Sequence, residues 1–227
     1  MSEVALKKKI PFKKNSHIIA TQPSINPDAS LVSSKLILPH GQSWVEIAET
    51  LPKLIQMDQL TFERIWNLHP KEYANGIIFG QSQEFKRWDQ SYGQDYKYAG
   101  KLHKSLPIED PFLDSLLKWV SSHSGQEYKA ILINWYQDGT HYIGYHADSE
   151  SSIVANSAIY SFSYGQERDF CLKSKDKSHQ QKIYMKNGSL IIMGGEMQKY
   201  YKHAVPKRAL STCPERRINI TLRLFKL

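Results

Sequence analysis

The spacing of apolar residues changes from helix-like to strand-like near residue 129. Before that point, apolar residues at helical spacing predict two amphipathic helices, at about 44–59 and 110–122. After it, short β-branched and aromatic runs are separated by turn residues, a pattern typical of strands. About eight strands are predicted, at 130–137, 142–147, 157–163, 168–173, 182–186, 189–193, 199–205 and 216–226. Such a series favours a β sandwich or jelly roll with the two helices flanking the sheet.

The last predicted strand carries polar side chains on one face and aliphatic side chains on the other. A strand's two-residue period places four polar residues together, namely Arg217, Asn219, Thr221 and Arg223. An amphipathic strand with a solvated face is one interpretation of this pattern. However, the two arginines would repel each other, so a dianionic ligand held by their guanidinium groups explains the pattern better. The strand at 130–137 similarly aligns Asn134 with Tyr136, whose amide and phenol can bond carboxylate oxygens.

A candidate metal site lies in the strand at 142–147 and just after it. His146 and Asp148 are two residues apart, so their side chains point to the same face. A second histidine would complete a facial triad, which leaves three positions on an octahedral iron(II) for a chelating cosubstrate and oxygen. His203 is the best candidate. A His-x-Asp pair by itself is weak evidence, and a surface histidine beside an aspartate is the alternative.

Composition indicates one domain and an anionic partner. The 227 residues, of which 41% are hydrophobic, can bury one substantial core, which we place at 36–227. Lysine and arginine number 30 against 22 acidic residues, an excess that favours nucleic acid, although solubility or an anionic membrane surface would also explain it. Apolar runs are too short to span a membrane and no secretory signal is present, so we expect a soluble intracellular protein, nuclear if eukaryotic and otherwise cytoplasmic.

The first 35 residues are rich in lysine, serine, proline and asparagine, and we expect a disordered tail at 1–35. Its basic cluster lies at 7–14. A nuclear-import signal, a non-specific phosphate-binding arm and a merely solvated tail are all open interpretations. The two cysteines, Cys171 and Cys213, lack the spacing of a metal site and give no disulfide framework.

Four linked motifs resemble the signature of the AlkB family of iron(II)- and 2-oxoglutarate-dependent dioxygenases. In order they are Asn134-x-Tyr136-x-Asp138-Gly139, His146-x-Asp148, the histidine about 55 residues further on, and Arg217-x-Asn219-x-Thr221-x-Arg223. Segments 161–170 and 188–193 resemble core strands of the branch that repairs duplex DNA in animals. The resemblance covers about 75–226. It implies a mainly β fold with flanking helices (α+β) around a double-stranded β-helix, or jelly-roll, core.

The resemblance also implies a role for each matched residue. His146, Asp148 and His203 would bind iron and form the catalytic centre. Arg217 and Tyr136 would hold the distal carboxylate of 2-oxoglutarate, and Asn134 and Arg223 would serve the end that chelates the metal. Asn219 and Thr221 would line the same pocket.

A segment at about 75–105 interleaves aromatic and basic residues, which suits stacking on bases and binding of phosphates. An ordinary β hairpin is the alternative, but the segment resembles the family's nucleotide-recognition lid. The expected substrate-binding residues are Phe79 as a wedge in the duplex, Arg87, Tyr96, Tyr98 as a clamp on the flipped base, and Glu150 as a reader of the base's amino group. Lys86 and Ser149 depart from the family pattern, which leaves the preferred base open.

The activity implied by the resemblance is oxidative demethylation of N-alkylated bases in DNA, such as 1-methyladenine and 3-methylcytosine. The reaction would use iron(II), 2-oxoglutarate and O2, pass through a ferryl oxidant, and release formaldehyde and succinate, so repairing alkylation damage directly. Methylated DNA is the expected partner and a monomer the expected state. Alternatives are an RNA demethylase or protein hydroxylase on the same core, or a non-catalytic jelly-roll module that binds nucleic acid. The wedge at Phe79 favours duplex DNA.

Overall fold

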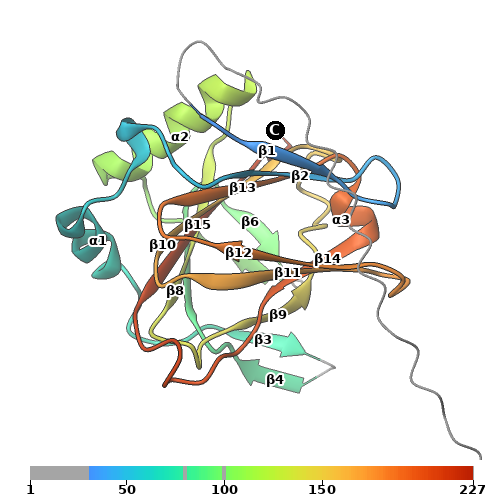
Figure 1. The fold of residues 1–227 in the computed structure, drawn as a ribbon. Helices are drawn as coiled ribbons and strands as arrows, with labels where there is room; N and C mark the ends of the chain where they lie inside the picture. The colour runs from blue at the N-terminus through green and yellow to red at the C-terminus, as the bar shows by residue number, and fades with distance from the viewer. Residues whose placement is uncertain (1–30, 79–80, 99–100, 227) are drawn as a thin grey trace, which may run out of the picture.

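The structure is a computed structural model that describes residues 31–78, 81–98 and 101–226 (Figure 1). Two antiparallel β sheets face each other, which confirms the predicted mainly β architecture with flanking helices. The larger sheet has seven strands in the order β1-β2-β13-β10-β15-β8-β5. The smaller sheet has four strands in the order β12-β11-β14-β9.

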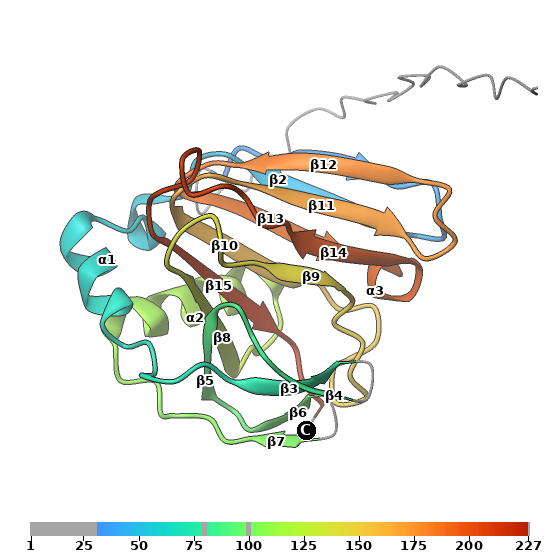
Figure 2. The ribbon, with the colours of Figure 1, turned by 90° about the horizontal axis from the view of Figure 1, so that it is seen from below.

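The strands of the larger sheet are β1 (Ser34–Ile37), β2 (Trp44–Ala48), β13 (Ser189–Gly194), β10 (Ile159–Gly165), β15 (Arg217–Arg223), β8 (Ala130–Tyr136) and β5 (Trp88–Gly93). Those of the smaller sheet are β12 (Gln180–Met185), β11 (Arg168–Ser174), β14 (Tyr201–Val205) and β9 (Ile143–His146). Two short hairpins, β3 (Asn75–Ile78) with β4 (Gln81–Glu84) and β6 (Tyr96–Tyr98) with β7 (Lys101–His103), flank β5 in the chain and lie at that end of the larger sheet (Figure 2).

Two helices cover the outer face of the larger sheet (Figure 1). They are α1 (Gln59–Trp66) and α2 (Pro111–Ser124), preceded by the 3-10 turn η1 (Lys53–Ile55). Asp110 accepts hydrogen bonds from the first backbone N–H groups of α2, and Gly125 ends it in the left-handed conformation at φ 68°. The aliphatic side chains of β8 and β15 pack against these helices, so the polar side chains of the same strands must face the other sheet.

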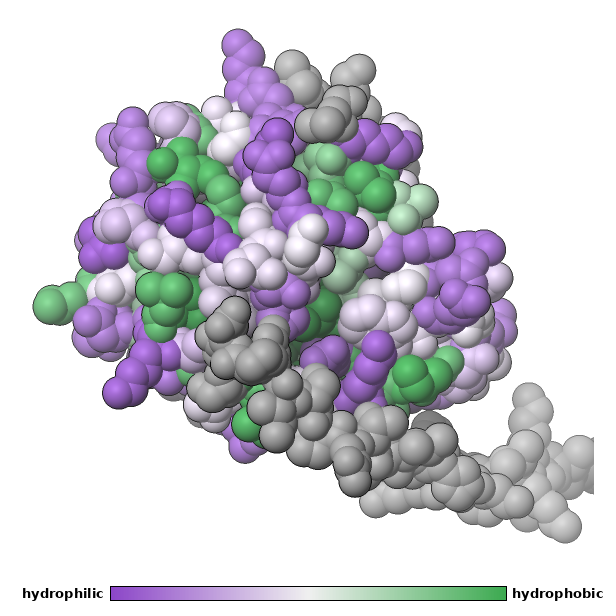
Figure 3. All heavy atoms as spheres, turned by 90° about the horizontal axis from the view of Figure 1, so that it is seen from above, coloured by the Kyte–Doolittle hydropathy of each residue, from purple (hydrophilic) through white to green (hydrophobic). Residues whose placement is uncertain are grey.

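A second apolar cluster fills part of the space between the sheets. It includes Phe170 and Leu172 of β11, Ile191 and Met193 of β13, and Val205 of β14. The short helix α3 (Met197–Tyr200) closes one end of this space. On the molecular face seen from above, hydrophilic residues predominate and hydrophobic ones form small groups (Figure 3). Because apolar side chains fill only part of the interior, the polar faces of β8 and β15 line what remains.

The helix predicted at 44–59 is wrong. Residues 44–48 form β2, which pairs with β1 on one side and β13 on the other. Pro52 cannot donate a backbone hydrogen bond, and α1 begins only at Gln59, where the Asp58 side chain accepts from the Thr61 N–H at 2.8 Å. The helical spacing of apolar residues at 44–51 reflects burial on both faces of a central strand.

The boundary of the predicted tail is also wrong. Leu31 is only 4% exposed within the core under the helices, and β1 begins at Ser34, so residues 31–35 belong to the fold. The rest of the predicted tail, 1–30, lies outside the described residues. The eight strands predicted after residue 129 are confirmed with shifted ends, except that residues 197–200 form α3 ahead of β14.

Candidate active site

Three potential metal ligands converge at one end of the smaller sheet. His146 on β9 and His203 on β14 are direct cross-strand partners, with ring centroids 4.2 Å apart. Asp148 follows β9 by two residues, and its Oδ1 lies 3.6 Å from His146 Nε2. One ligand atom of each residue lies within 4.8 Å of the others, which is close enough to hold one metal ion. The pairing of β9 with β14 thus brings together residues that are far apart in the chain.

The surroundings of these residues keep both imidazoles neutral and the carboxylate ionised. Burial lowers the pKa of His203 to about 3, and it also lowers the pKa of His146. Burial would raise the pKa of Asp148, but the Arg223 guanidinium holds it well below its ordinary value. These are the protonation states that metal binding requires.

The donor set fits a divalent metal such as iron(II). His146 Nδ1 donates to the Gly144 carbonyl at 2.9 Å, so its Nε2 keeps a free lone pair. Within the described part of the chain, the buried Nδ1 of His203 has no hydrogen-bond partner. Two imidazoles and one carboxylate form the set that suits non-haem iron(II) and leaves positions open for other ligands.

The polar residues of β15 face this site from the larger sheet. Arg217, Asn219, Thr221 and Arg223 are all at most 8% exposed. The register of β15 with β8 sets Arg217 opposite Tyr136 and Asn219 opposite Asn134. The sequence-predicted cosubstrate residues therefore form one continuous polar surface on two paired strands.

The Arg217 guanidinium is only partly hydrogen-bonded within the described part of the chain. Its Nη2 donates to Ser163 Oγ at 2.9 Å, and its Cζ lies 5.0 Å from the centre of the Tyr136 ring. Its Nε and Nη1 are buried and meet no hydrogen-bond partner among the described residues. Burial lowers its pKa to about 10, which leaves it charged at neutral pH. A buried cation with free N–H groups suits a carboxylate such as the distal one of 2-oxoglutarate.

Arg223 has a different partner. Its Nε and Nη2 both lie 2.9 Å from Asp148 Oδ2, so it binds the candidate metal carboxylate. Arg223 lines the cavity beside Asp148, and its predicted contact with the metal-chelating end of the cosubstrate stays a prediction.

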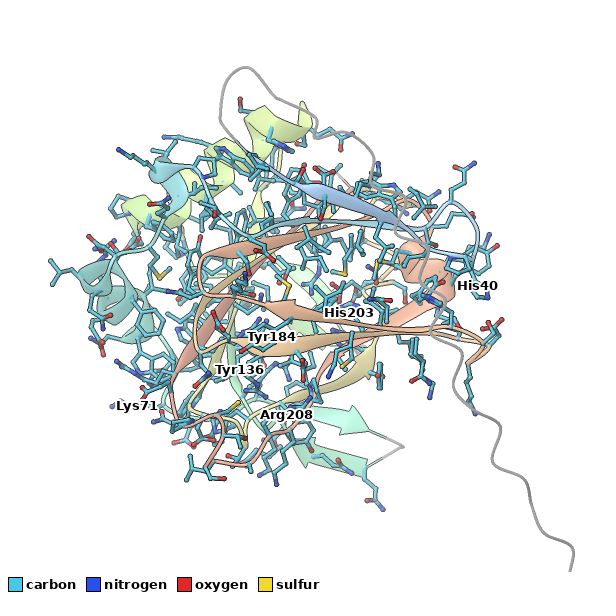
Figure 4. The ribbon with its side chains drawn as sticks, in the orientation of Figure 1. His40, Lys71, Tyr136, Tyr184, His203 and Arg208 are labelled. Carbon is cyan, nitrogen blue, oxygen red and sulfur yellow. The ribbon has the colours of Figure 1, made fainter. Side chains whose placement is uncertain are left out.

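The cavity between the sheets joins the metal ligands to these polar strands. His146, Asp148 and His203 line it from one side, and Asn134, Tyr136, Asn219, Thr221 and Arg223 from the other. Asn219 Nδ2 donates to Ser161 Oγ at 2.8 Å and to the Phe162 carbonyl at 2.7 Å, so its amide is held by β10. Figure 4 labels Tyr136 and His203, which come from opposite sheets.

Arg87 lies inside the cavity rather than on its outer surface. It is 7% exposed, and its Nε donates to Asn134 Oδ1 at 2.6 Å. Its guanidinium also lies 5.0 Å from the Phe85 ring centre and 3.7 Å from Asp89. Phe85 and Asp89 line the cavity too, and the sequence analysis missed both. No pattern in the sequence indicates this, because Phe85 and Arg87 lie in the bend between β4 and β5 and only Asp89 belongs to a strand.

Of the remaining predicted substrate residues, only Glu150 has a side chain that the structure describes. Glu150 lines a neighbouring cavity formed by residues 148–157 and α3, where its buried Oε2 has no hydrogen-bond partner within the described ranges and burial raises its pKa. Tyr96 and Tyr98 belong to β6, but their side chains lie outside the described part of the structure, as does Phe79 altogether. Their roles stay predictions.

Arg168 is a structural residue whose importance the sequence did not reveal. It is 1% exposed and donates to four carbonyls, those of Asp138, Gly139, His141 and Pro206, over distances of 2.7 to 3.4 Å. Its Cζ lies 5.9 Å from the Tyr136 ring centre. Arg168 thereby connects the loop after β8 to the segment after β14, next to the polar surface formed by β8 and β15.

Facing sheets, a His/Asp/His cluster and a buried arginine in one cavity define a class of oxygenases that bind a metal and a keto acid. A family model described as "2OG-Fe(II) oxygenase superfamily" matches residues 59–223, and the chain belongs to this superfamily. Its members use iron(II), 2-oxoglutarate and O2.

Comparison with named proteins confirms the resemblance to AlkB homologues. The chain is 31% identical over 172 residues to human "DNA oxidative demethylase ALKBH2", a match that covers 69% of this chain and 65% of that protein. It is 30% identical over 195 residues to "Alpha-ketoglutarate-dependent dioxygenase alkB homolog 3" of Rattus norvegicus, covering 82% and 65%. The chain therefore spans slightly less than two thirds of the length of these relatives.

The fold is shared with a solved structure titled "The structure of OsALKBH1". The two superimpose with a TM-score of 0.56 at 15% identity, over 82% of this chain and 99% of the other. No helix within the described ranges is long and apolar enough to cross a membrane.

Proposed function

We propose that this chain is an oxidative demethylase of N-methylated bases in DNA, with 1-methyladenine and 3-methylcytosine as its substrates. The observation that carries the proposal is the convergence of His146, Asp148 and His203 on one cavity whose opposite wall includes Tyr136 and Arg223. Arg217 lies opposite Tyr136 in the sheet, and its Nε and Nη1 have no hydrogen-bond partner among the described residues. The names of the relatives support DNA as the substrate.

In this proposal His146, Asp148 and His203 hold iron(II), which supplies with 2-oxoglutarate and O2 the oxidising power to hydroxylate a methyl C–H bond. One oxygen atom enters the methyl group and the other enters succinate, while 2-oxoglutarate loses carbon dioxide. The hydroxymethyl group on a ring nitrogen then leaves as formaldehyde and restores the base. The chain itself binds and orients the cosubstrate and the base, and it excludes water from the cavity.

In this proposal the cosubstrate is held by Arg217 and by polar residues that line the cavity. Arg217 and Tyr136 bind its distal carboxylate, and Asn134 and Arg223 fix the end nearest the metal. Arg223 also holds Asp148 ionised and in place, because its two nitrogens lie 2.9 Å from Asp148 Oδ2. Asn219 and Thr221 complete the polar wall.

The substrate enters from the side of the two hairpins around β5 (Figure 2). Phe85 and Arg87 line the cavity there, so a flipped base would pass a flat ring and a guanidinium before it reached the metal ligands. Phe79, Tyr96, Tyr98 and Glu150 remain the proposed wedge, clamp and base-reading residues. The net charge of +8 supports approach to the polyanionic backbone.

The test is formaldehyde release from a DNA duplex that carries one 1-methyladenine, with iron(II), ascorbate and 2-oxoglutarate. Release should require 2-oxoglutarate and be lost in His146→Ala, while Lys118→Gln on the outer surface of α2 should match the wild type. Parallel assays with methylated single-stranded DNA and RNA identify the preferred nucleic acid. Binding of 2-oxoglutarate without turnover of any of them would contradict the proposal and favour a protein hydroxylase.

A further inference from the structure

The outer face of the four-stranded sheet carries lysines on three adjacent strands. Inward side chains of this sheet include His203 and the apolar residues of the inner core, so the alternate positions point outward. The outward positions include Lys173 on β11, Lys182 on β12 and Lys202 on β14. Lys182 and Lys202 are exposed and Lys173 is half-buried. We call this surface the outer lysine face.

The positive charge of this face is only partly balanced. Lys173 and Lys202 are direct cross-strand partners, and like charges in that position repel each other. Neither forms an ion pair with any residue that the structure describes. The one carboxylate on the outward side of β11, Asp169, is already engaged by Arg208 and lies 3.9 Å from Lys182. An anion bound between Lys173 and Lys202 would relieve their repulsion.

Two exposed tyrosines lie on the same face. Tyr145 on β9 is 46% exposed and Tyr184 on β12 is 56% exposed. The Lys173 ammonium lies 5.9 Å from the centre of the Tyr145 ring, and Figure 4 labels Tyr184 on the smaller sheet. Exposed rings beside lysines on an open sheet provide stacking surfaces for bases and cations for phosphates, the combination that binds single-stranded nucleic acid.

The face is continuous with the candidate active site. Tyr145 directly precedes the metal ligand His146, so successive side chains of β9 point to the outer face and into the cavity. Likewise, Lys202 directly precedes His203 on β14. A strand whose base occupied the cavity could therefore continue over the edge of β9 onto the outer lysine face.

We propose that the outer lysine face binds a single-stranded segment of the nucleic acid whose methylated base occupies the cavity. This inference rests on the proposed function and adds to it a second contact region, with Tyr145 and Tyr184 stacking on bases and Lys173 and Lys202 binding phosphates. A duplex would keep its bases paired and away from these rings, so the occupant is unpaired strand.

The first test compares oligonucleotides of two lengths. Fluorescence anisotropy measures binding of unmodified single-stranded DNA of about 25 nucleotides and about five nucleotides over a range of salt concentrations. For the double variant Lys173→Gln/Lys202→Gln we expect about tenfold weaker binding of the long strand, and a salt dependence whose slope falls by about 0.7 per lysine. Binding of the short strand should not change.

The matched control is Lys53→Gln/Lys118→Gln, which removes two exposed lysines from η1 and α2 beyond the larger sheet. It should bind the long strand within about twofold of the wild type. Equal losses for both double variants, an unchanged salt slope, or equal losses on both strand lengths would overturn the proposal.

The second test separates stacking from charge. Tyr184→Ala should weaken binding of the long strand by about tenfold, whereas Tyr184→Phe, which keeps the ring, should bind like the wild type. If Tyr184→Phe bound the long strand as weakly as Tyr184→Ala, the stacking role of Tyr184 would be wrong.

These binding assays use unmodified DNA and need no turnover, so they succeed or fail independently of demethylation. Formaldehyde release from a short methylated oligonucleotide should be the same in Lys173→Gln/Lys202→Gln as in the wild type. If the face binds long strands but no methylated DNA is turned over, the proposed function fails and the binding surface stands. If binding of the long strand depends on neither these lysines nor strand length, the outer lysine face is only solvated.

Discussion

Arg223 donates from Nε to Oδ2 of Asp148 at 2.9 Å, so an arginine of the predicted cosubstrate strand holds the predicted metal carboxylate. The two side chains are 10% and 2% exposed, and their pair links β15 of the larger sheet to the end of β9 in the smaller one. The metal half and the cosubstrate half of the cavity are thereby connected across the two sheets. A change at Arg223 should affect both halves.

Arg223→Met leaves the Asp148 carboxylate buried without its guanidinium partner. Breaking a buried ion pair by removing one member costs about 3–5 kcal/mol, so we expect the metal-free protein to lose stability by about that amount. Added Mn(II) should restore part of the loss, because the metal replaces the lost positive charge. Chemical unfolding with and without Mn(II) measures both effects. A variant as stable as the wild type in the absence of metal would contradict the role of this pair.

Arg217→Met, unlike Arg223→Met, is not expected to lower the stability of the protein without 2-oxoglutarate. Its guanidinium is buried, and its Nε–H and Nη1–H meet no hydrogen-bond partner in the described part of the chain, so an apolar side chain of similar volume should leave stability unchanged or raised. Affinity for 2-oxoglutarate should fall by at least about tenfold, because a charge-assisted pair is lost. Titration calorimetry with 2-oxoglutarate and thermal unfolding without it check the two halves of the prediction. If the variant bound 2-oxoglutarate with wild-type affinity, Arg217 would not be a cosubstrate-binding residue.

The parts of the site that the sequence predicted are those fixed by a strand's two-residue period. The alternation in β15 placed Arg217 and Arg223 on one face, and the same period aligned Asn134 with Tyr136. His203 could not be found this way, because its meeting with His146 depends on how β9 pairs with β14. The sequence made His203 the best candidate for the second histidine, and the family resemblance supported it, since spacing alone does not distinguish it from other histidines.

The errors arose where contacts between distant segments override local pattern. The apolar spacing at 44–51 favours a helix, but β13, far along the chain, supplies a hydrogen-bonding partner that makes this segment a central strand. Leu31 lies in a polar stretch that looks like tail, yet it is buried under the helices. The bond between Arg87 and Asn134 likewise depends on pairing of β5 with β8.

Acid should loosen the connection between the hairpin region and the loop after β8. His141 Nδ1 accepts from the Gln137 N–H at 3.2 Å, and its Nε2 lies 3.1 Å from the Tyr73 hydroxyl. Burial lowers the pKa of His141 below its ordinary value of 6.5. The unfolded chain therefore binds this proton first, so the stabilisation is full above about pH 6.5 and is lost as the pH falls toward the folded-state pKa.

The comparison is His141→Gln, whose amide oxygen can accept the same hydrogen bond but does not titrate. Thermal unfolding followed from pH 7.5 to about pH 5.5 should show a steeper loss in the wild type than in the variant. The other histidines are common to both proteins, so they cancel in the difference. Parallel curves would mean that His141 does not couple this loop to pH.

Replacing Arg168 should affect both stability and cosubstrate binding. Arg168→Met removes the side-chain donor to four carbonyls, of which those of Asp138 and Gly139 keep a backbone donor. We expect this to cost about 3 kcal/mol in urea unfolding. Because Arg168 fixes the loop that follows Tyr136, the KM for 2-oxoglutarate should rise by more than kcat falls. Arg168→Lys should recover little, since one ammonium cannot reach carbonyls on both segments.

The matched control is Arg208→Lys, which changes the arginine that pairs with Asp169 on the outer side of the same sheet. That variant should keep the wild-type KM for 2-oxoglutarate, because it retains the Arg208 backbone N–H that donates to the Gly139 carbonyl at 2.6 Å and changes only the side chain that pairs with Asp169. A purely structural Arg168 would lower the amount of folded enzyme and the apparent kcat while the KM stayed constant. The rise in KM is therefore the result that distinguishes positioning of the cosubstrate site from general support of the fold.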